Sequence, residues 1–503
     1  MPLESADPPI ISQARAHAGR TAVVAPEGRF TYADLLDASA RVASALLAGA
    51  DDLREARVAF LAAPGWHYVA TQWGIWRAGG IAVPLAVSHP PAELEYVVQD
   101  ADASIVIAGR GFAEVLRPIA ARNGRRFLST DDALAAEPVV MPGVDEARRA
   151  MIVYTSGTTG KPKGVVTTHA NVRAQVTTLV QAWEWSADDR TLLVLPLHHV
   201  HGIVNVLSCA LWSGAACEIL PRFDADETWR AIESGRLSLF MAVPTVYNRL
   251  IAAYDQAPPE RQTRMAEGCR RMRLMVSGSA ALPVQTLERW RQISGHVLLE
   301  RYGMTEIGMA LSNPLRGERR PGFVGLPLPS VAVRLMDDEG GEAPPGTPGE
   351  VEIGGPSVFA EYWRRPEATA EAFRDGWFRT GDVAVVEDGY YRLLGRRSVD
   401  IIKTGGYKVS ALEIEEVLRT HPAIAECAVV GVDDPDWGER ICVAVEGTDG
   451  SGLELDELQG WARDHLAAYK LPRDLRRVDA LPRNAMGKVM KPEVAKLFAA
   501  GGG

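Results

Sequence analysis

The stretch from Thr155 to Gly164, Thr-Ser-Gly-Thr-Thr-Gly-Lys-Pro-Lys-Gly, combines glycines, hydroxyls and two lysines in ten residues. We expect positive φ at Gly157, Gly160 and Gly164, so that N–H groups, hydroxyls and lysines approach anionic oxygens closely. An ordinary surface turn has no use for this set, and the spacing is not that of the Gly-x-x-x-x-Gly-Lys-Ser/Thr nucleotide loop. This composition predicts a polyphosphate site. Its candidate ligands are Thr155, Ser156, Gly157, Thr158, Thr159, Gly160 and Lys163.

Two acidic motifs accompany this stretch, Tyr302-Gly-Met-Thr-Glu306 and Phe378-Arg-Thr-Gly-Asp382, and both are expected where strands end. Mg²⁺ favours few carboxylates plus substrate phosphates, so Glu306 is a candidate metal ligand. Asp382 is a candidate acceptor for ribose hydroxyls. An isolated acidic residue at a strand end is more often a cap or turn residue, so neither motif suffices without the other. Lys488 follows a glycine in a polar loop, where most lysines are simply solvated.

Length and composition limit the classes of protein. With 503 residues the chain exceeds the size of a single hydrophobic core, so two or more domains are expected. The net charge of −10 and the pI of 5.6 argue against nucleic acid or anionic lipid as partners. Five scattered cysteines without a Cys-x-x-Cys pair fit reduced thiols. The chain begins without a signal-like segment and contains no apolar stretch of membrane-spanning length, so we expect a soluble, cytoplasmic protein with no membrane partner.

Strands and helices alternate along the first part of the chain. Thr31 and Asp34 predict a capped amphipathic helix that continues to Leu46. Short apolar runs that alternate with helical periodicity predict mainly parallel sheets covered by helices, an α/β fold. The expected strands are 57–61, 81–84, 104–108, 150–154, 192–195, 237–243, 274–276 and 297–299, and further helices are expected at 65–79 and 92–98.

Beyond about residue 330 the pattern changes to short strands separated by turns in which an acidic residue precedes glycine. Strands at 331–335, 349–353 and 383–386 predict a small β-rich subdomain over 330–396. A compact α+β unit follows. Its expected elements are a helix at 411–419, strands at 428–432 and 441–445, and a helix near 455–466. We therefore expect an N-terminal domain over 1–396 and a C-terminal domain over 397–503.

Four motifs together resemble those of the adenylate-forming superfamily of acyl-CoA synthetases, luciferases and peptide-synthetase adenylation domains. In chain order they are Thr155-Ser-Gly-Thr-Thr-Gly160, Tyr302-Gly-Met-Thr-Glu306, Thr380-Gly-Asp382 and Asn484-Ala-Met-Gly-Lys488. The resemblance covers nearly the whole chain. It implies a large N-terminal domain, a mobile C-terminal domain and two half-reactions, acyl-adenylate formation and then thioester formation. ATP, Mg²⁺ and coenzyme A are the implied small molecules.

The resemblance also implies residue roles. Lys488 would bridge the substrate carboxylate and the α-phosphate, two groups that repel unless cations neutralise them. Thr305 would contact the α-phosphate, and Glu306 would hold Mg²⁺. Asp382 and Arg397 would hold the ribose. Further implied nucleotide contacts are Glu300, Tyr302 and Gly303.

A second face of the C-terminal domain is expected to receive coenzyme A after a domain rotation. The implied contacts are Lys403, Thr404, Gly405, Gly406 and Tyr407. The glycines would let the pantetheine arm pass close to the backbone, although a simple hairpin turn would explain the glycine pair equally well. The hinge position of the superfamily carries Asp or Lys, and here it falls on Val399.

Histidines and arginines lie among the segments expected to line the acyl pocket. A buried arginine without an anion is costly, so Arg301 is expected to bind a substrate carboxylate, unless it pairs with a protein Asp or Glu. His199 is expected near the reacting carboxylate and His201 beside it, although a lone histidine is more often a satisfied core residue. The candidate acyl-site residues are His199, His201, Arg249, Ser279, Arg301, Met304 and Met309.

Arg301, Ser279 and Arg249 resemble the set that grips the distal carboxylate in the malonyl-CoA and methylmalonyl-CoA synthetase branch of the superfamily. This resemblance implies conversion of malonate, and of methylmalonate as a second substrate, to the CoA thioester with release of AMP and pyrophosphate. Unlike mitochondrial members of the branch, the chain shows no Arg-rich, Ser-rich transit segment. Another small acid, a carrier-protein thiol as acceptor, and a catalytically silent binding protein remain alternatives. A monomer or weak homodimer is expected.

Overall fold

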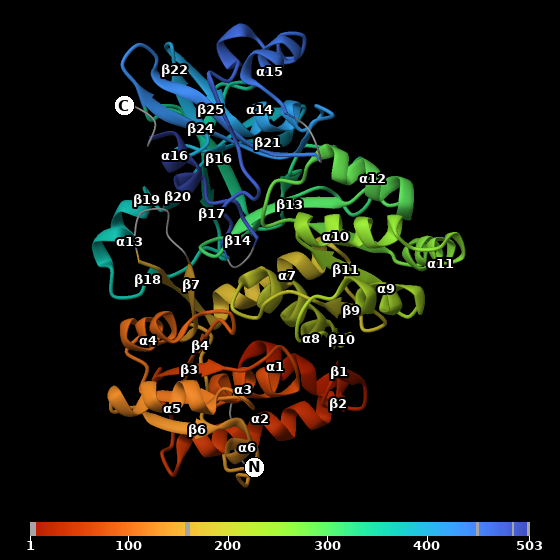
Figure 1. Cartoon of the computed structure of the whole chain (residues 1–503). Coiled ribbons are helices and arrows are strands. Elements are labelled where there is room, and N and C mark those ends of the chain that lie inside the picture. Colours follow the sequence, from red (N-terminus) through yellow and green to blue (C-terminus); the bar gives the residue numbers. More distant parts are fainter. Residues whose placement is uncertain (1–6, 156–160, 449–451, 485–486, 500–503) are drawn as a thin grey trace. The chain divides into compact units, whose positions relative to one another are not determined.

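The computed structural model describes residues 7–155, 161–448, 452–484 and 487–499 (Figure 1). The chain forms two compact units. The first comprises Met1–Arg320, Leu326–Ala332 and Ile353–Phe378, and the second comprises Pro321–Gly325, Val333–Glu352 and Arg379–Gly503. All five cysteines are buried and free of disulfides. In the described ranges, none of the helices has the length and apolar character that crossing a membrane requires.

One sheet of the first unit has the strand order β15-β14-β13-β12-β11-β9-β10-β1-β2 and is parallel from β13 to β1. Its central strands are buried on both faces, as expected for a parallel sheet covered by helices. The strands are β1 (Thr21–Ala25), β2 (Gly28–Thr31), β9 (Arg190–Leu193), β10 (Ala216–Ile219), β11 (Leu239–Ala242), β12 (Leu274–Ser277), β13 (Leu299–Met304), β14 (Gly308–Ser312) and β15 (Leu326–Pro327).

The other sheet of the first unit has the order β18-β8-β7-β4-β3-β5-β6. It is parallel except where β8 pairs with β7 and with β18. Its strands are β3 (Arg57–Leu61), β4 (Ile81–Pro84), β5 (Ile105–Ala108), β6 (Arg126–Ser129), β7 (Arg149–Thr155), β8 (Lys163–Thr168) and β18 (Glu361–Tyr362).

Helix layers alternate with these two sheets (Figure 1). One layer is α4 (Pro91–Asp100) and α5 (Ala113–Arg122), which pack on the outer face of the seven-stranded sheet. The layer between the sheets contains α1 (Pro9–Ala14), η1 (Arg15–His17), α2 (Tyr32–Leu47), α3 (Trp66–Arg77), α6 (Thr130–Leu134), α7 (His169–Ala182), the π-helix η2 (His201–Ser208) and α8 (Cys209–Ser213). The last layer is α9 (Ala225–Glu233), α10 (Pro244–Asp255), α11 (Pro259–Arg270) and α12 (Val284–Ser294). The predicted α/β architecture is confirmed.

Local sequence signals explain several element ends. Thr31 caps α2 as predicted, because its side chain accepts from Asp34 N while Asp34 Oδ2 accepts from Thr31 N at 2.7 Å. The strand expected at 297–299 instead begins at Leu299 and continues to Met304, because β14 pairs with its second half.

The second unit contains a β-rich part and an α+β part, whereas the sequence predicts the β-rich part within the N-terminal domain. A strand pair in it joins β20 (Trp377–Glu387) to β21 (Tyr390–Arg396) in antiparallel register. A later sheet has the order β23-β22-β25-β24, with β26 beside β25. The remaining bounds are α13 (Pro366–Ala372) and β19 (Phe373–Arg374) near the end of the first unit, then β16 (Ala332–Met336), β17 (Gly349–Gly354), β22 (Ile401–Thr404), β23 (Tyr407–Ser410), α14 (Ala411–Leu418), β24 (Ile424–Asp434), β25 (Gly438–Gly447), α15 (Leu455–Ala462), η3 (Ala468–Lys470), β26 (Asp474–Arg477) and α16 (Lys491–Ala499).

Candidate active site

The predicted phosphate loop joins two paired strands of the first unit. Thr155 ends β7 and Lys163 begins β8, and these residues lie opposite each other in the ladder. The expectation that the loop leaves a buried strand is confirmed. Gly164 lies within β8 opposite Tyr154, not at positive φ, and its missing side chain matters for packing because a Cβ there would lie 2.7 Å from Ile152 Cγ2. Ser156, Gly157, Thr158, Thr159 and Gly160 lie outside the described residues.

Tyr362 brings the phosphate loop and the predicted metal ligand together. Its hydroxyl donates to Glu306 Oε1 at 2.9 Å, and Lys163 Nζ lies 5.2 Å from the centre of its ring. Strand β18 places the residue there, since Tyr362 pairs with Val165 of β8. Glu306 is only 6% exposed, so its carboxylate is held in a polar cluster away from bulk water. Sequence reasoning missed Tyr362, because nothing in its neighbours indicates a contact with a distant carboxylate.

The hairpin of β13 and β14 carries most of the other first-unit candidates. Thr305 and Glu306 lie in its turn, after the end of β13 as expected, and both are buried. Side chains alternate along β13, so Glu300 and Tyr302 lie on the face opposite to Arg301. Glu300 Oε1 accepts weakly from Leu282 N at 3.4 Å. Gly303 and Met304 complete the strand, where Met304 is half-buried, and Met309 on β14 is buried.

Arg301 lies in the interior, and no acidic side chain among the described residues pairs with it. The residue is 3% exposed, and its Nε and Nη2 have no hydrogen-bond partner among the described residues. Burial lowers the pKa of Arg301 to about 9. The guanidinium lies against the bare Cα of Gly278, where a Cβ would be 2.6 Å from Cζ. The alternative of pairing with a protein Asp or Glu therefore finds no support in the described residues, and the guanidinium is open to an anionic ligand.

His201 and Ser279 lie near this guanidinium. His201 Nδ1 lies 3.1 Å from Ser279 Oγ, and Ser279 directly follows Gly278 at a φ of 70°. Burial, and next the charge of Arg301, hold the pKa of His201 well below its usual value, so the ring is neutral near pH 7. His201 also begins the π-helix η2, a rare conformation that is frequent at functional sites. His199 is half-buried and burial lowers its pKa to about 4.

Arg249 is an acyl-site candidate for which the described structure shows no contact with this group. It lies on α10 and is exposed. Among the described residues no hydrogen bond or ion pair joins its side chain to Arg301 or Ser279. The structure thus brings Arg301, Ser279 and His201 together, and a role for Arg249 at this group stays a prediction.

In the second unit, Arg396 and not Arg397 pairs with Asp382. Arg396 Nε donates to Asp382 Oδ1 at 3.0 Å, because the two residues lie opposite each other in the β20–β21 ladder. Arg397 instead donates to Glu350 Oε2 at 3.0 Å and to Asp338. The expectation that Asp382 sits at a strand end is also wrong, since β20 continues to Glu387.

The remaining second-unit candidates lie on exposed turns. Lys488 is exposed, and its backbone N donates to Asn484 Oδ1 at 3.0 Å. Val399 lies in the turn after β21, where its N donates to Arg396 O at 3.0 Å. The predicted CoA contacts form the β22–β23 hairpin. Its glycines have φ of 56° and 84°, the conformation of a type I′ turn. The members are Lys403, Thr404, Gly405, Gly406 and Tyr407, all exposed except Thr404.

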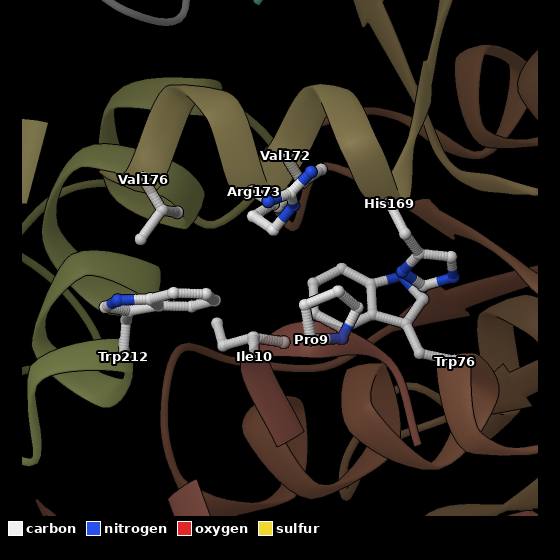
Figure 2. A pocket seen from close by; sticks show the side chains of 8 residues that line it. All are labelled: Pro9, Ile10, Trp76, His169, Val172, Arg173, Val176 and Trp212. Atoms are coloured by element: carbon white, nitrogen blue, oxygen red, sulfur yellow. The ribbon is translucent and has the colours of Figure 1, made fainter. Parts of the chain in front are cut away.

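A small pocket of the first unit is separate from these residues. Figure 2 shows that tryptophans, apolar side chains and two basic residues line it. Burial lowers the pKa of His169 in its wall to about 3. None of the predicted site residues borders this pocket, so we do not assign it a part in the chemistry. The lining residues are Pro9, Ile10, Trp76, His169, Val172, Arg173, Val176 and Trp212.

The fold and the motif residues define the class of protein. Residues 11–363 match the family model described as AMP-binding enzyme, and residues 413–488 match the model described as AMP-binding enzyme C-terminal domain. The chain belongs to this family, which confirms the superfamily resemblance.

Individual proteins are similar to this chain over nearly its whole length. The chain is 47% identical to the malonate–CoA ligase ACSF3, mitochondrial, of Homo sapiens, over 97% of this chain and 92% of the human protein. It is 42% identical to a malonate–CoA ligase of Arabidopsis thaliana, over 96% of this chain and 87% of the plant protein. The crystal structure of ATP-bound MatB from Rhodopseudomonas palustris superposes with a TM-score of 0.91 at 34% identity, covering 98% of this chain and 99% of MatB.

Proposed function

We propose that this chain is an ATP-dependent, AMP-forming acid–CoA ligase that converts malonate, and also methylmalonate, to the CoA thioester. Arg301 carries the proposal, because a buried guanidinium with open N–H groups needs an anion and the distal carboxylate of a diacid supplies one. Neutral His201 and Ser279 add polar groups beside it. The likeness to malonate–CoA ligases supports the same substrate.

In the first half-reaction, a carboxylate oxygen of the acid attacks the α-phosphorus of ATP, the bond from this phosphorus to the bridging oxygen breaks, and pyrophosphate leaves. We assign neutralisation of the approaching anions to Lys488 and Lys163, and contact with the α-phosphate to Thr305. His199 is neutral at pH 7, because burial lowers its pKa to about 4, so it can line the acyl site without attracting the carboxylate away from phosphorus.

In the second half-reaction, the CoA thiol loses its proton to solvent and its sulfur attacks the acyl carbonyl carbon. The bond from this carbon to the AMP oxygen breaks, and AMP leaves. We assign the β22–β23 hairpin from Lys403 to Tyr407 to CoA, since its turn is exposed and its two glycines carry no side chain that would keep a ligand from the backbone.

Mg²⁺ is expected at Glu306, and the local residues fit this ion. Glu306 is a buried carboxylate that accepts from the Tyr362 hydroxyl, and Lys163 lies beside the ring of Tyr362. Among the described residues no group of three or more His, Cys, Asp or Glu side chains could hold a metal by itself. A single carboxylate completed by substrate phosphates is the donor set that Mg²⁺ favours. Bound there, Mg²⁺ would neutralise phosphate charge.

A panel of acids tests the proposal. The purified chain is incubated with ATP, Mg²⁺ and CoA plus malonate, methylmalonate, succinate, acetate or a long-chain acid, and AMP and thioester are measured. Malonate is expected to give the highest kcat/KM, and replacement of CoA by a phosphopantetheinylated carrier protein should lower the rate. A preference for acetate or the long-chain acid would contradict the proposal.

Other expectations stay predictions. They are the domain boundary at residue 397, the cytoplasmic location, and the monomeric or weakly dimeric state. Limited proteolysis, cell fractionation and sedimentation velocity test them in that order.

A further inference from the structure

Lys491, the first residue of α16, lies between two carboxylates of the second unit. Its Nζ is 2.6 Å from Asp400 Oδ1 and 2.8 Å from Glu415 Oε1. Burial alone would lower the pKa of Lys491, but Glu415 and Asp400 outweigh burial and raise it. The three side chains are between 4% and 15% exposed. Removing one member of such a buried ion pair is destabilising, because the charge of the remaining member is then buried without a partner.

Asp400 links this ion pair to the turn after β21. Its Oδ2 accepts from Arg396 N at 2.9 Å, and its backbone N donates to Arg396 O at 2.7 Å. Its carbonyl oxygen accepts from Ala411 N, at the start of α14, at 2.8 Å. Since Arg396 also donates to Asp382, the carboxylate of Asp400 connects the proposed ribose contact with the helices that follow.

Glu415 forms the fixed side of the ion pair. Its Oε1 accepts from Val429 N on β24 at 2.8 Å, and Arg419 lies 3.3 Å from its Oε2. Helix α14 and strand β24 thus hold Glu415 in place independently of Lys491.

Lys491 ends the loop that carries Lys488. Asn484 N donates to Lys488 O at 2.9 Å, Lys488 N donates to Asn484 Oδ1 at 3.0 Å, and Met490 N donates to Pro482 O at 2.8 Å. These bonds join Pro482 and Asn484 to Lys488 and Met490, and the ion pair of Lys491 lies three residues beyond Lys488. The position of Lys488 therefore depends on where Lys491 is held.

We propose that Lys491 is a positioning residue for adenylate formation. Its ion pair with Asp400 fixes the Lys488 loop relative to the turn after β21. The inference rests on the proposed function. A continuous set of contacts joins the two proposed nucleotide contacts of this unit, from Asp382 through Arg396, Asp400 and Lys491 to the loop of Lys488. The test therefore separates an effect on Lys488 from a general loss of stability.

The variants Lys491→Met and Lys491→Arg are compared in the full chain, with malonate, ATP and Mg²⁺ but no CoA, by pyrophosphate release and hydroxylamine trapping of the adenylate. We expect Lys491→Met to lower kcat by about 10-fold or more, KM for ATP to stay within about 2-fold, and Lys491→Arg to restore most of the rate. Lys496→Met is the matched control, because Lys496 lies exposed on the same helix and pairs only with Glu493 at 2.7 Å in the described structure. It should keep wild-type rates.

The same substitution is then made in a Lys488→Ala background. If Lys491 acts through Lys488, Lys491→Met should slow residual adenylation by less than about 2-fold there. An equal loss in both backgrounds overturns the inference. Asp400→Asn, which keeps the shape of the side chain, serves if Lys491→Met does not fold, and wild-type kcat in a folded Asp400→Asn variant also overturns it. Absence of adenylate from the wild type with every acid would instead refute the proposed function.

Discussion

The guanidinium of Arg301 occupies the space in which Gly278 has no side chain. A Cβ at residue 278 would lie 2.6 Å from Arg301 Cζ and 2.7 Å from its Nε and Nη1. Contacts under 3 Å between carbon atoms are repulsive, so residue 278 must remain glycine for the guanidinium to stay in its present position. The position of Arg301 on β13 thus depends on the missing side chain of Gly278, which directly follows β12.

Gly278→Ala is expected to weaken selection of diacids. The added methyl displaces Arg301, so kcat/KM for malonate should fall by about 30- to 5,000-fold, which corresponds to the ~2–5 kcal/mol range for removing one partner of a buried charge pair. The ratio of malonate to acetate turnover measures the effect. Arg301→Ala should remove the preference for malonate over acetate. Adding Gly278→Ala to the Arg301→Ala variant should then change the turnover ratio little. Undiminished selectivity for malonate in the Arg301→Ala variant would show that the acyl site lies elsewhere.

Tyr362→Phe is expected to weaken binding of Mg²⁺·ATP. The phenylalanine keeps the ring beside Lys163 but removes the hydrogen bond to Glu306, so the carboxylate loses an orienting donor. The Mg²⁺ concentration for half-maximal rate should rise about 3- to 10-fold, and calorimetric affinity for Mn²⁺·ATP should fall in parallel, since outer partners tune metal affinity by up to ~10–100-fold.

Tyr96→Phe is a matched control for the preceding prediction. The ring of Tyr96 lies beside Lys161, with Nζ 5.4 Å from its centre, and its hydroxyl donates to Pro162 O at 2.9 Å. Tyr96, on α4, therefore contacts the same loop, and in the described structure its hydroxyl makes no hydrogen bond to Glu306. Equal shifts in the Mg²⁺ dependence of both variants would argue against a specific role for Tyr362.

Arg396→Gln is expected to impair nucleotide binding more than Arg397→Gln. Arg396 donates to the carboxylate of Asp382, and a hydrogen bond to a charged group contributes ~1.5–3 kcal/mol, which corresponds to about 10- to 100-fold in affinity. Fluorescence titration with an AMP analogue measures the difference. Arg397→Gln should act mainly on stability, through Glu350 and Asp338. The opposite order of affinities would support the ribose role that the sequence predicts for Arg397.

The stability of the first unit is expected to fall as the pH drops from about 6.5 towards 3. Burial lowers the pKa of His169 to about 3, so the unfolded chain binds a proton on this side chain in that interval and the folded chain does not. The free energy of unfolding should therefore decrease by up to ~1.4 kcal/mol per pH unit for this group. Denaturant unfolding of wild type and His169→Gln at pH 8, 6 and 5 measures the slope, which should be shallower in the variant.

The amino-acid sequence is sufficient to predict the fold class and the local motifs. Apolar runs such as 57–61 and 81–84 become β3 and β4 at the predicted bounds, because a strand buried on both faces needs consecutive apolar residues. The cap at Thr31 and the glycine turn at 405–406 are equally local, since each depends on residues within one turn of chain.

Contacts between distant residues could not be predicted in this way. Tyr362 and Glu306 are 56 positions apart, and they meet only because β18 pairs with β8. Arg396, and not Arg397, pairs with Asp382 because of the register of β20 and β21. A shift of one residue in this register would exchange the side chains on the two faces.

Short motifs are enough to predict a phosphate-binding glycine loop, acidic motifs and a distant lysine in this chain, because the chemistry of each motif depends on neighbouring residues. Which side chains meet follows from the packed fold: Arg301 meets Gly278, Asp382 meets Arg396, and Lys491 meets Asp400. Strand order, register and burial are properties of the whole packed chain, and they set both the distances between charges and the free-energy cost of leaving a charge without a partner.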